Sequence, residues 1–368
     1  MPRRLQTDIF LVGAILLLVG FGVAMVYSAS AAIGLQQYGS SFHFVIRQSI
    51  YALAGLTAMW MLMKYDYRNL ANPRLIFPAL AVALVLLMAV FLMPVRHETH
   101  RWLYAGPLSL QPSELAKVLV IIFVAYFLDV RREAVNDIRH TLAPLGLIVG
   151  LVVALILKEP DLGTSLDIVL IAAVMLFAAG LRLRYFAGAS LAAVPLLYVV
   201  ITHAKYRMNR LMGFLHPNSD PLGKGFQRFQ ALIAVGSGGI SGVGAGEGHQ
   251  KLFFLPEPQT DFIFAVISEE WGFIGALVVL LLFGVILCRG LKAAAGAPDG
   301  FGKLLAMGII VLLVGQALVN MSVVIGLLPT KGIPLPFISY GGSSLVVNLA
   351  AAGILLNISR QAAGRSVS

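Results

Sequence analysis

Long apolar runs separated by short polar segments make up most of this 368-residue chain. Roughly 20 apolar residues are enough to cross a bilayer as a helix, so each long run predicts one membrane span. Continuous runs favour a helical bundle over an outer-membrane barrel, whose strands alternate in polarity. We therefore predict an all-α integral membrane protein, built as a single polytopic domain over 1–368. The ten expected spans cover approximately 8–30, 44–63, 74–94, 112–130, 142–157, 165–181, 184–202, 261–288, 303–327 and 341–358.

The charges between the spans predict the orientation of the chain. An even number of spans places both termini on one side of the membrane. The run from Ile9 to Tyr27 is long enough to remain as a span instead of being cleaved as a signal. Basic residues of the short loops gather on the side of the termini, which the positive-inside rule makes cytoplasmic. They include Arg3, Arg4, Lys64, Arg68, Arg74, Arg131, Arg132, Arg139, Arg182, Arg184, Arg289, Lys292, Lys303, Arg360 and Arg365.

The longest segment between spans is a loop of roughly 203–260, expected outside the cytoplasm between spans seven and eight. Loops of this length are usually functional or disordered. Phe226, Phe229 and the apolar run 232–235 predict short amphipathic helices within it.

Composition agrees with a membrane protein, because 59% of the residues are hydrophobic and 12% are charged, against about 25% charged in soluble domains. The net charge of +10 does not indicate nucleic acid, since the basic residues lie in short loops between apolar runs, as membrane topology requires; membrane lipids are expected as neighbours instead. Cys288 is the single cysteine, which excludes an internal disulfide and a cysteine-based metal site. The glycine-rich stretch 236–246 matches neither nucleotide-binding fingerprint, so no nucleotide is expected.

Ionisable residues recur at the predicted outer ends of the spans. Asp261 stands one step inside an apolar run, where a carboxylate is costly to desolvate and usually faces a partner or a wet cavity. Glu114 and Lys117 are three residues apart and share a helical face. The other candidates at this boundary are Arg101, Asp161, Glu257, Lys331 and Ser343.

Structural roles compete with functional ones at each position. Glu114 and Lys117 can form an ion pair of purely structural value, and Asp161 suits a turn or an N-cap. Asp261 can cap its own helix, where a carboxylate complements the helix dipole. Taken together, the group indicates a catalytic cavity or a transport pathway. A transporter usually buries its site near the midplane, so charges gathered at the outer boundary favour chemistry on a lipid-linked substrate.

Several motifs resemble the SEDS family (shape, elongation, division and sporulation), which includes FtsW and RodA. The run Pro-Thr-Lys-Gly-Ile-Pro-Leu-Pro at 329–336 is part of the most specific match. Gln250 and the residues around Lys331 are closer to FtsW than to RodA. The matching segments are 111–117, 159–165, 220–227, 251–275 and 327–344.

The resemblance implies a peptidoglycan glycosyltransferase that polymerises lipid II at the outer face of the bacterial cytoplasmic membrane, in division or in shape. In such a reaction the acceptor hydroxyl displaces undecaprenyl pyrophosphate with inversion. The essential aspartate of the family matches Asp261, which would act as the base or as a ligand to Mg²⁺ or Mn²⁺. Arg101, Glu114, Lys117 and Asp161 match further important residues; Lys117 and Arg101 would meet the pyrophosphate, and Glu114 would hold Lys117.

The resemblance also implies partners. Family members work with a class B penicillin-binding protein, a transpeptidase, and with other membrane proteins of the divisome or elongasome. Two other functions remain open at this point. The chain can be a flippase that moves lipid II across the bilayer, or a scaffold that only activates the transpeptidase.

Overall fold

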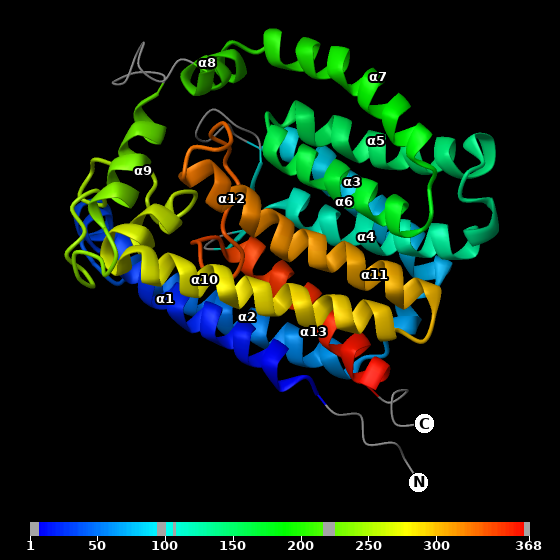
Figure 1. Ribbon diagram of the computed structural model, residues 1–368, viewed down its shortest axis with the longest axis horizontal. Coiled ribbons are helices and arrows are strands. Elements are labelled where there is room, and N and C mark those ends of the chain that lie inside the picture. Colours follow the sequence, from blue (N-terminus) through cyan, green and yellow to red (C-terminus); the bar gives the residue numbers. More distant parts are fainter. Residues whose placement is uncertain (1–6, 94–100, 106–107, 216–224, 364–368) are drawn as a thin grey trace.

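The computed structural model describes residues 7–93, 101–105, 108–215 and 225–363. Residues 220–224 of the 220–227 motif, with Arg3, Arg4 and Arg365, lie outside this range. The described chain is almost entirely helical, which confirms the predicted class (Figure 1). The helices are α1 (Ile9–Tyr38), α2 (His43–Lys64), α3 (Pro73–Ala89), α4 (Pro112–Val130), α5 (Ala143–Lys158), α6 (Leu162–Ala178), α7 (Leu183–Thr202), α8 (Lys205–Leu215), α9 (Phe226–Ser237), α10 (Ile263–Gly296), α11 (Gly300–Ile310), α12 (Gln316–Val324) and α13 (Gly342–Ala363).

Shorter elements join these helices. Strands β1 (Leu103–Ala105) and β2 (Leu108–Leu110) pair antiparallel just before α4, with Tyr104 opposite Ser109. A π-helical turn η4 (Ile138–Leu142) precedes α5, and a second, η5 (Val311–Gly315), joins α11 to α12. Single 3-10 turns are η1 (Tyr67–Ala71), η2 (Val90–Leu92) and η3 (Arg132–Ala134).

Each predicted span corresponds to a helix, the ninth being α11, η5 and α12 together. Among the described residues, eight helical segments are long and apolar enough to cross a membrane, while α6 is a shorter apolar helix. Helix α4 is apolar along most of its length but carries Glu114, Lys117 and Asp129. The predicted loop 203–260 contains α8 and α9, and the apolar residues that predicted short helices fall in α9.

Two spans are longer than the sequence pattern suggested. Helix α1 continues past residue 30, and the Ser30 hydroxyl is satisfied inside it by donating to the Val26 carbonyl (2.6 Å). It ends at Gly39, whose φ of 70° is left-handed and is favourable for glycine. Helix α10 continues to Gly296, and Arg289 near its end pairs with Asp8 (2.7 Å) before α1.

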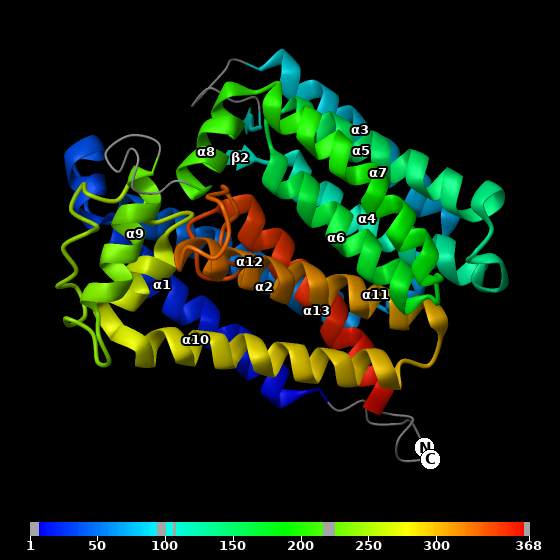
Figure 2. The same cartoon turned by 45° about the horizontal axis from the view of Figure 1, so that its top comes forward.

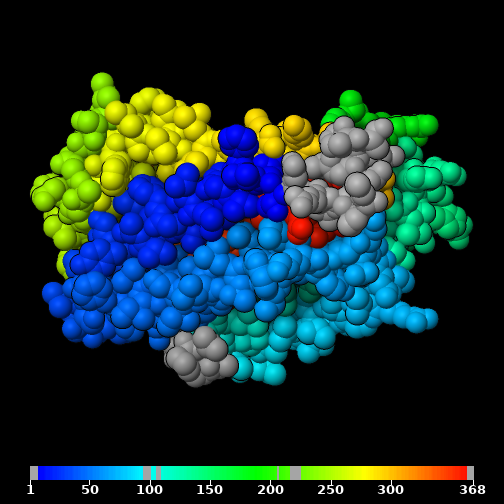
Figure 3. All heavy atoms as spheres, turned by 90° about the horizontal axis from the view of Figure 1, so that it is seen from below, coloured from blue at the N-terminus to red at the C-terminus, as the bar shows by residue number. Residues whose placement is uncertain are grey.

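The other helices surround α13 and the continuous helical segment formed by α11, η5 and α12. Most residues of α13 are buried inside the bundle, whereas α7 has no buried residue and faces outward along its length. Helix α13 packs along α2, and α10 packs along both α1 and α11 (Figure 2). In the space-filling view, α1, α2 and α3 cover most of one face and leave only small parts of α13 visible (Figure 3). The start of α1 and the end of α13 lie at the same end of the bundle.

Helix α10 is broken at Gly272, where φ is 62° and ψ is −161°. The loop after α9 repairs the break with four backbone hydrogen bonds. The N–H groups of Val243 and Gly244 donate to the carbonyls of Glu269 and Glu270 (3.0 and 3.1 Å). On the other side of the break, two helix N–H groups donate into the loop, from Phe273 to Gly239 (2.9 Å) and from Ile274 to Ile240 (3.2 Å). These four bonds supply partners for backbone groups that the break leaves without a helical partner.

Two buried carboxylates anchor the same loop. Glu269 Oε1 accepts from the N–H groups of His249 and Gln250 (2.9 and 3.2 Å). Glu270 Oε1 pairs with Lys251 Nζ (2.7 Å), and Ser28 of α1 bonds to both side chains (2.6 and 2.8 Å). Since Lys251 precedes Asp261 and Glu270 follows it, this ion pair closes a loop that carries Asp261.

We predict that Gly272→Ala lowers the thermal unfolding temperature of the purified protein markedly. A Cβ at position 272 would lie 2.3 Å from Gly242 N and 2.5 Å from Ile240 O, and its φ is strained for alanine. The matched control is Gly284→Ala in the regular part of α10, where a Cβ meets nothing within 4 Å. That control should be neutral or stabilising, and equal unfolding temperatures for the two variants would contradict the role of the break.

Candidate active site

Four segments far apart in the sequence meet at one end of the bundle and enclose a polar cavity of about 370 Å³. They are the start of α4 with its preceding hairpin, the first turns of α6, the segment before α10, and the segment 331–341 before α13. Arg210 of α8 completes the wall. The lining residues are Arg101, Trp102, Gln111, Glu114, Lys117, Thr164, Asp167, Arg210, Glu257, Thr260, Asp261, Gly332, Ile333, Pro334, Tyr340, Gly341 and Ser344.

Asp261 lies in this cavity and does not cap α10, whose N-cap is Phe262 without a side-chain bond. Its backbone is held by the segment 331–341. Ser339 Oγ donates to the Thr260 carbonyl (2.6 Å), and Tyr340 N donates to the Gln259 carbonyl (2.8 Å). The main chain is thus fixed while the carboxylate faces the cavity.

Desolvation raises the pKa of Asp261 from 3.8 to about 7. Arg210 and Arg101 lower this pKa, whereas Glu257 and Asp161 raise it further. A carboxylate with such a pKa exchanges protons readily near neutral pH, which suits a general base.

Lys117 forms a buried charge cluster with residues of three helices. Its Nζ lies 3.0 Å from Glu114 Oε1 on α4 and 3.8 Å from Asp167 Oδ2 on α6. It also donates to Gln316 Oε1 on α12 (2.8 Å). Glu114 and Lys117 are each 2% exposed. The spacing of Glu114 and Lys117 predicted their contact, but the sequence did not connect Asp167 or Gln316 with them.

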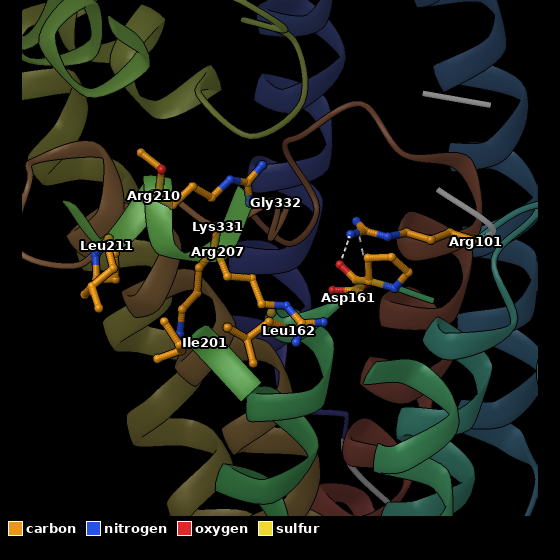
Figure 4. Close-up of a pocket in the computed structure, with 13 residues that line it drawn as sticks. Arg101, Asp161, Leu162, Ile201, Arg207, Arg210, Leu211, Lys331 and Gly332 are labelled. Atoms are coloured by element: carbon orange, nitrogen blue, oxygen red, sulfur yellow. Dashed lines mark hydrogen bonds and ion pairs between the residues drawn. The ribbon is translucent and has the colours of Figure 1, made fainter. Parts of the chain in front are cut away.

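Asp161 caps a helix and also pairs with a cation of the site. Its carboxylate caps α6 by accepting from Thr164 N (3.0 Å) and Thr164 Oγ1 (2.9 Å). It also faces Arg101, with 3.8 Å between Oδ2 and Nη1 (Figure 4). Arg101 is held by the α5–α6 turn, donating to the carbonyls of Glu159 (3.3 Å) and Pro160 (2.6 Å). The turn therefore presents one guanidinium to the cavity.

A smaller basic cavity of about 70 Å³ adjoins the first and shares Arg101, Arg210 and Gly332 with it. Arg207, Arg210 and Lys331 lie on its opposite side from Arg101 (Figure 4). Burial lowers the pKa of Lys331, and Asp167 partly opposes that change. The sequence placed Arg207 and Arg210 in the long loop without assigning them a role. The three-residue spacing of Arg207 and Arg210 places both on one face of a helix, and this spacing is the sequence signal that could have indicated a shared cavity.

The remaining sequence candidates lie at the edge of the cavity or behind it. Glu257 is exposed at the rim and accepts from Gln259 Nε2 (3.0 Å). Ser343 does not line either cavity, because its hydroxyl donates to the Ser109 carbonyl (2.8 Å) and accepts from Gln111 N (3.1 Å). It joins β2 to the start of α13, and its neighbour Ser344 lines the cavity instead.

Glu159 is a buried acid that the sequence did not single out. Its side chain is inaccessible to solvent. Burial and the nearby Asp161 raise the pKa of Glu159 to about 8, while Arg101 lowers it. At neutral pH this carboxyl is therefore mostly protonated, and it adds little negative charge beside Arg101.

The divalent cation expected at Asp261 can be tested against the donor groups. Within the described residues, no three His, Cys, Asp or Glu side chains lie close enough to hold a metal ion. Mg²⁺ often uses only one or two carboxylates together with substrate phosphates and water. Asp261 alone does not make a protein cage, so the cation stays a prediction, and no chemical step is derived through it.

Comparison with protein families gives a match over almost the whole chain. The family model described as "Cell cycle protein", for FtsW, RodA and SpoVE, matches residues 9–364. A probable peptidoglycan glycosyltransferase FtsW of Geobacter metallireducens is 46% identical over 347 residues, which is 94% of this chain and 92% of the relative. Stage V sporulation protein E of Bacillus subtilis is 43% identical over 361 residues, which is 97% of this chain and 98% of the relative.

Solved structures show the same arrangement of helices. A chain from a study titled "Structural coordination of polymerization and crosslinking by a peptidoglycan synthase complex" aligns with a TM-score of 0.79 at 32% identity. That alignment covers 97% of this chain and 98% of the other. The rod shape determining protein RodA of Thermus thermophilus aligns with a TM-score of 0.70 at 29% identity, covering 98% of both chains.

Lys117→Met should lower the free energy of unfolding by about 3–5 kcal/mol, because Glu114 and Asp167 lose the buried cation that they share. Thermal or denaturant unfolding in detergent measures this change. Adding Glu114→Gln to Lys117→Met should recover part of the loss, since it removes one of the uncompensated carboxylates.

The exposed pair of Arg68 and Asp299 (3.0 Å) supplies the control for this prediction. Arg68→Met should cost no more than about 1 kcal/mol, as is typical of surface ion pairs. A loss for Lys117→Met as small as that for Arg68→Met would show that the buried cluster does not depend on its cation.

Proposed function

The chain belongs to the family of cell cycle proteins that comprises FtsW, RodA and SpoVE, and on this premise we propose that it polymerises lipid II into peptidoglycan glycan strands during division. It is a multi-pass protein of the bacterial inner membrane. The observation that carries the proposal is the cavity that Asp261 lines together with Arg101, Arg210 and residues of the Lys117 cluster.

The reaction needs a base and a site for the departing negative charge. A sugar hydroxyl of the acceptor attacks the anomeric carbon of the donor, the bond to undecaprenyl pyrophosphate breaks, and the configuration inverts. Asp261 accepts the hydroxyl proton, for which a pKa of about 7 is well matched. The pyrophosphate carries away the bonding electron pair as negative charge, which nearby cations stabilise.

The basic side chains around the two cavities have different roles in this reaction. Arg101 and Arg210 line both cavities, and Lys331 lines the smaller one, so they form a basic rim suited to pyrophosphate. Arginine offers a planar fork to phosphate oxygens. Lys117 Nζ already faces Glu114, Asp167 and Gln316. We therefore assign Lys117 to the charge and shape of the cavity wall instead of to the pyrophosphate.

The position of the cavity supports a polymerase more than a flippase. Glu114 lies in the first turn of α4, Asp161 caps α6, and Asp261 precedes α10, so all three stand at helix N-termini at one end of the bundle. A transport site would instead be expected near the middle of the spans. We further propose a class B penicillin-binding protein as the partner, because a relative of known structure comes from a peptidoglycan synthase complex.

Asp261→Asn should abolish polymerisation, because the amide cannot accept the hydroxyl proton. The measurement is glycan formation from lipid II in detergent, with and without the penicillin-binding protein. We expect at least a 10²-fold loss, on the order of a general base contribution. Asp137→Asn is the matched control, because Asp137 is a half-exposed cap on the α4–α5 connection and its replacement keeps the cap.

The same preparations discriminate the other functions. Lipid II translocation in vesicles without any polymer would favour the flippase. Full activity of Asp261→Asn in cells would favour the scaffold. A polymerisation rate that is unchanged by the penicillin-binding protein, with no co-purification of the two chains, would contradict the proposed partner.

The polymerisation rate at saturating lipid II should rise with pH through a midpoint near 7. Below this midpoint Asp261 is protonated and cannot act as the base, because burial has raised its pKa from 3.8 to about 7. Above it the carboxylate is ionised and the rate should level off. A rate that stays flat between roughly pH 5.5 and 8.5, with the fold intact throughout, would exclude Asp261 as the titrating base.

A further inference from the structure

Two buried amide side chains lie one helical turn apart on α12, directly behind the cavity. Gln316 is inaccessible to solvent and Asn320 is 2% exposed. Their four-residue spacing places them on the same helical face. Neither residue is ionisable, and neither was among the candidates that the sequence indicated.

Gln316 connects the Lys117 cluster to the segment before α13. Its Oε1 accepts from Lys117 Nζ (2.8 Å), and its Nε2 donates to the Pro334 carbonyl (2.8 Å). The amide provides an acceptor and a donor at these two points within one planar group.

Asn320 makes the corresponding connection for the proposed base. Its Nδ2 donates to the carbonyl of Asp261 (2.9 Å) and to the carbonyl of Ile333 (2.7 Å). Both protons of the amide are thereby used. Ile333 and Pro334 are consecutive, so the two amides tie the two sides of the cavity to adjacent carbonyls of one segment.

The backbone before these residues contributes to their orientation. The π-helical turn η5 ends at Gly315, immediately before Gln316. One inserted residue rotates all later side chains by about 100° around the helix axis. Such π turns often occur at functional sites. Because of this turn, the helical segment of α11, η5 and α12 presents apolar residues of α11 to the core and presents Gln316 and Asn320 towards the cavity.

The two ends of the Asn320 amide differ. Its Oδ1 is buried and accepts no hydrogen bond within the described part of the chain, whereas its Nδ2 bridges two carbonyls. The side chain therefore contributes through the bridge, and an apolar residue at this position would leave both carbonyls without this donor.

We propose that Gln316 and Asn320 are positioning residues, which set the separation of the Lys117 cluster from Asp261 by binding both to the carbonyls of Ile333 and Pro334. This inference rests on the proposed function, because it concerns the geometry of that reaction. The two residues act through Asp261 and Lys117 and need not touch the substrate.

The experiment compares Asn320→Leu and Gln316→Met with Asn357→Leu as the matched control. Asn357 on α13 is also a buried amide that joins two main-chain groups. It donates to the Met63 carbonyl (2.8 Å) and accepts from Tyr67 N (3.2 Å), near the end of α13 away from the cavity. Each variant is assayed for lipid II polymerisation, giving kcat and KM, and for its thermal unfolding temperature.

All three substitutions should lower the unfolding temperature by similar amounts, because each removes a buried bridging amide. Only Asn320→Leu and Gln316→Met should lower kcat, by on the order of 10²-fold, since a displacement of about 1 Å in an active site has such an effect. Their KM should change much less. Asn357→Leu should keep the kcat of the unchanged protein.

Asn320→Asp keeps the size of the side chain and serves if Asn320→Leu does not fold. It retains at most one of the two donated protons, so its kcat should also fall. The proposal is overturned if the Asn320 and Gln316 variants keep the kcat of the Asn357 control, or if all three lose kcat in proportion to stability. Absence of polymer from the unchanged protein would instead overturn the proposed function.

Discussion

Removal of charge from water at one end of an apolar bundle is the constraint on which this structure depends. Each ionisable group there needs a partner, because an unpaired buried charge is far more costly than a paired one. Lys117 is balanced by Glu114 and Asp167, and Asp161 faces Arg101. Asp261 is a carboxylate whose desolvation is only partly compensated, as its raised pKa indicates. The same desolvation that makes this group unfavourable for folding makes it suitable as a base.

The segment 331–341 serves as the common support of the site. Its carbonyls at Ile333 and Pro334 bind the two amides of α12, and Ser339 and Tyr340 bind the backbone before Asp261. Non-helical backbone within a membrane protein is tolerated where protein groups accept or donate its hydrogen bonds, or where it lines a water-filled cavity. The long Pro- and Gly-containing motif thus has a physical explanation, since its groups at Ile333, Pro334, Ser339 and Tyr340 hold the elements around the cavity.

Helix α10 and the loop before it form a second support. The break at Gly272 exposes backbone groups that the loop satisfies, and Glu269 and Glu270 fix the loop base through its N–H groups and Lys251. The chain from residue 251 to 262 is therefore held at both ends while it carries Asp261. Both supports restrict the carboxylate through the backbone and leave its side chain facing the cavity.

Local chemistry in the sequence determined the helices and part of the site. Apolar runs long enough to cross a bilayer become helices in any arrangement, since lipid offers no partner for backbone groups. The contact between Glu114 and Lys117 follows from their spacing on one helix. The capping role of Asp161 follows from its turn, and the family motifs located Arg101 and Asp261.

Only the tertiary structure decided which distant residues complete these groups. Gln316 meets Lys117 across 199 residues, and Ser28 meets Glu270 across 242. No local period encodes such contacts, because they depend on how helices pack and on the rotation introduced by η5. The same reason explains why Ser343 lies behind the cavity while Ser344 lines it: adjacent residues on a helix point in different directions, and packing of α13 against β2 selects which one faces the site.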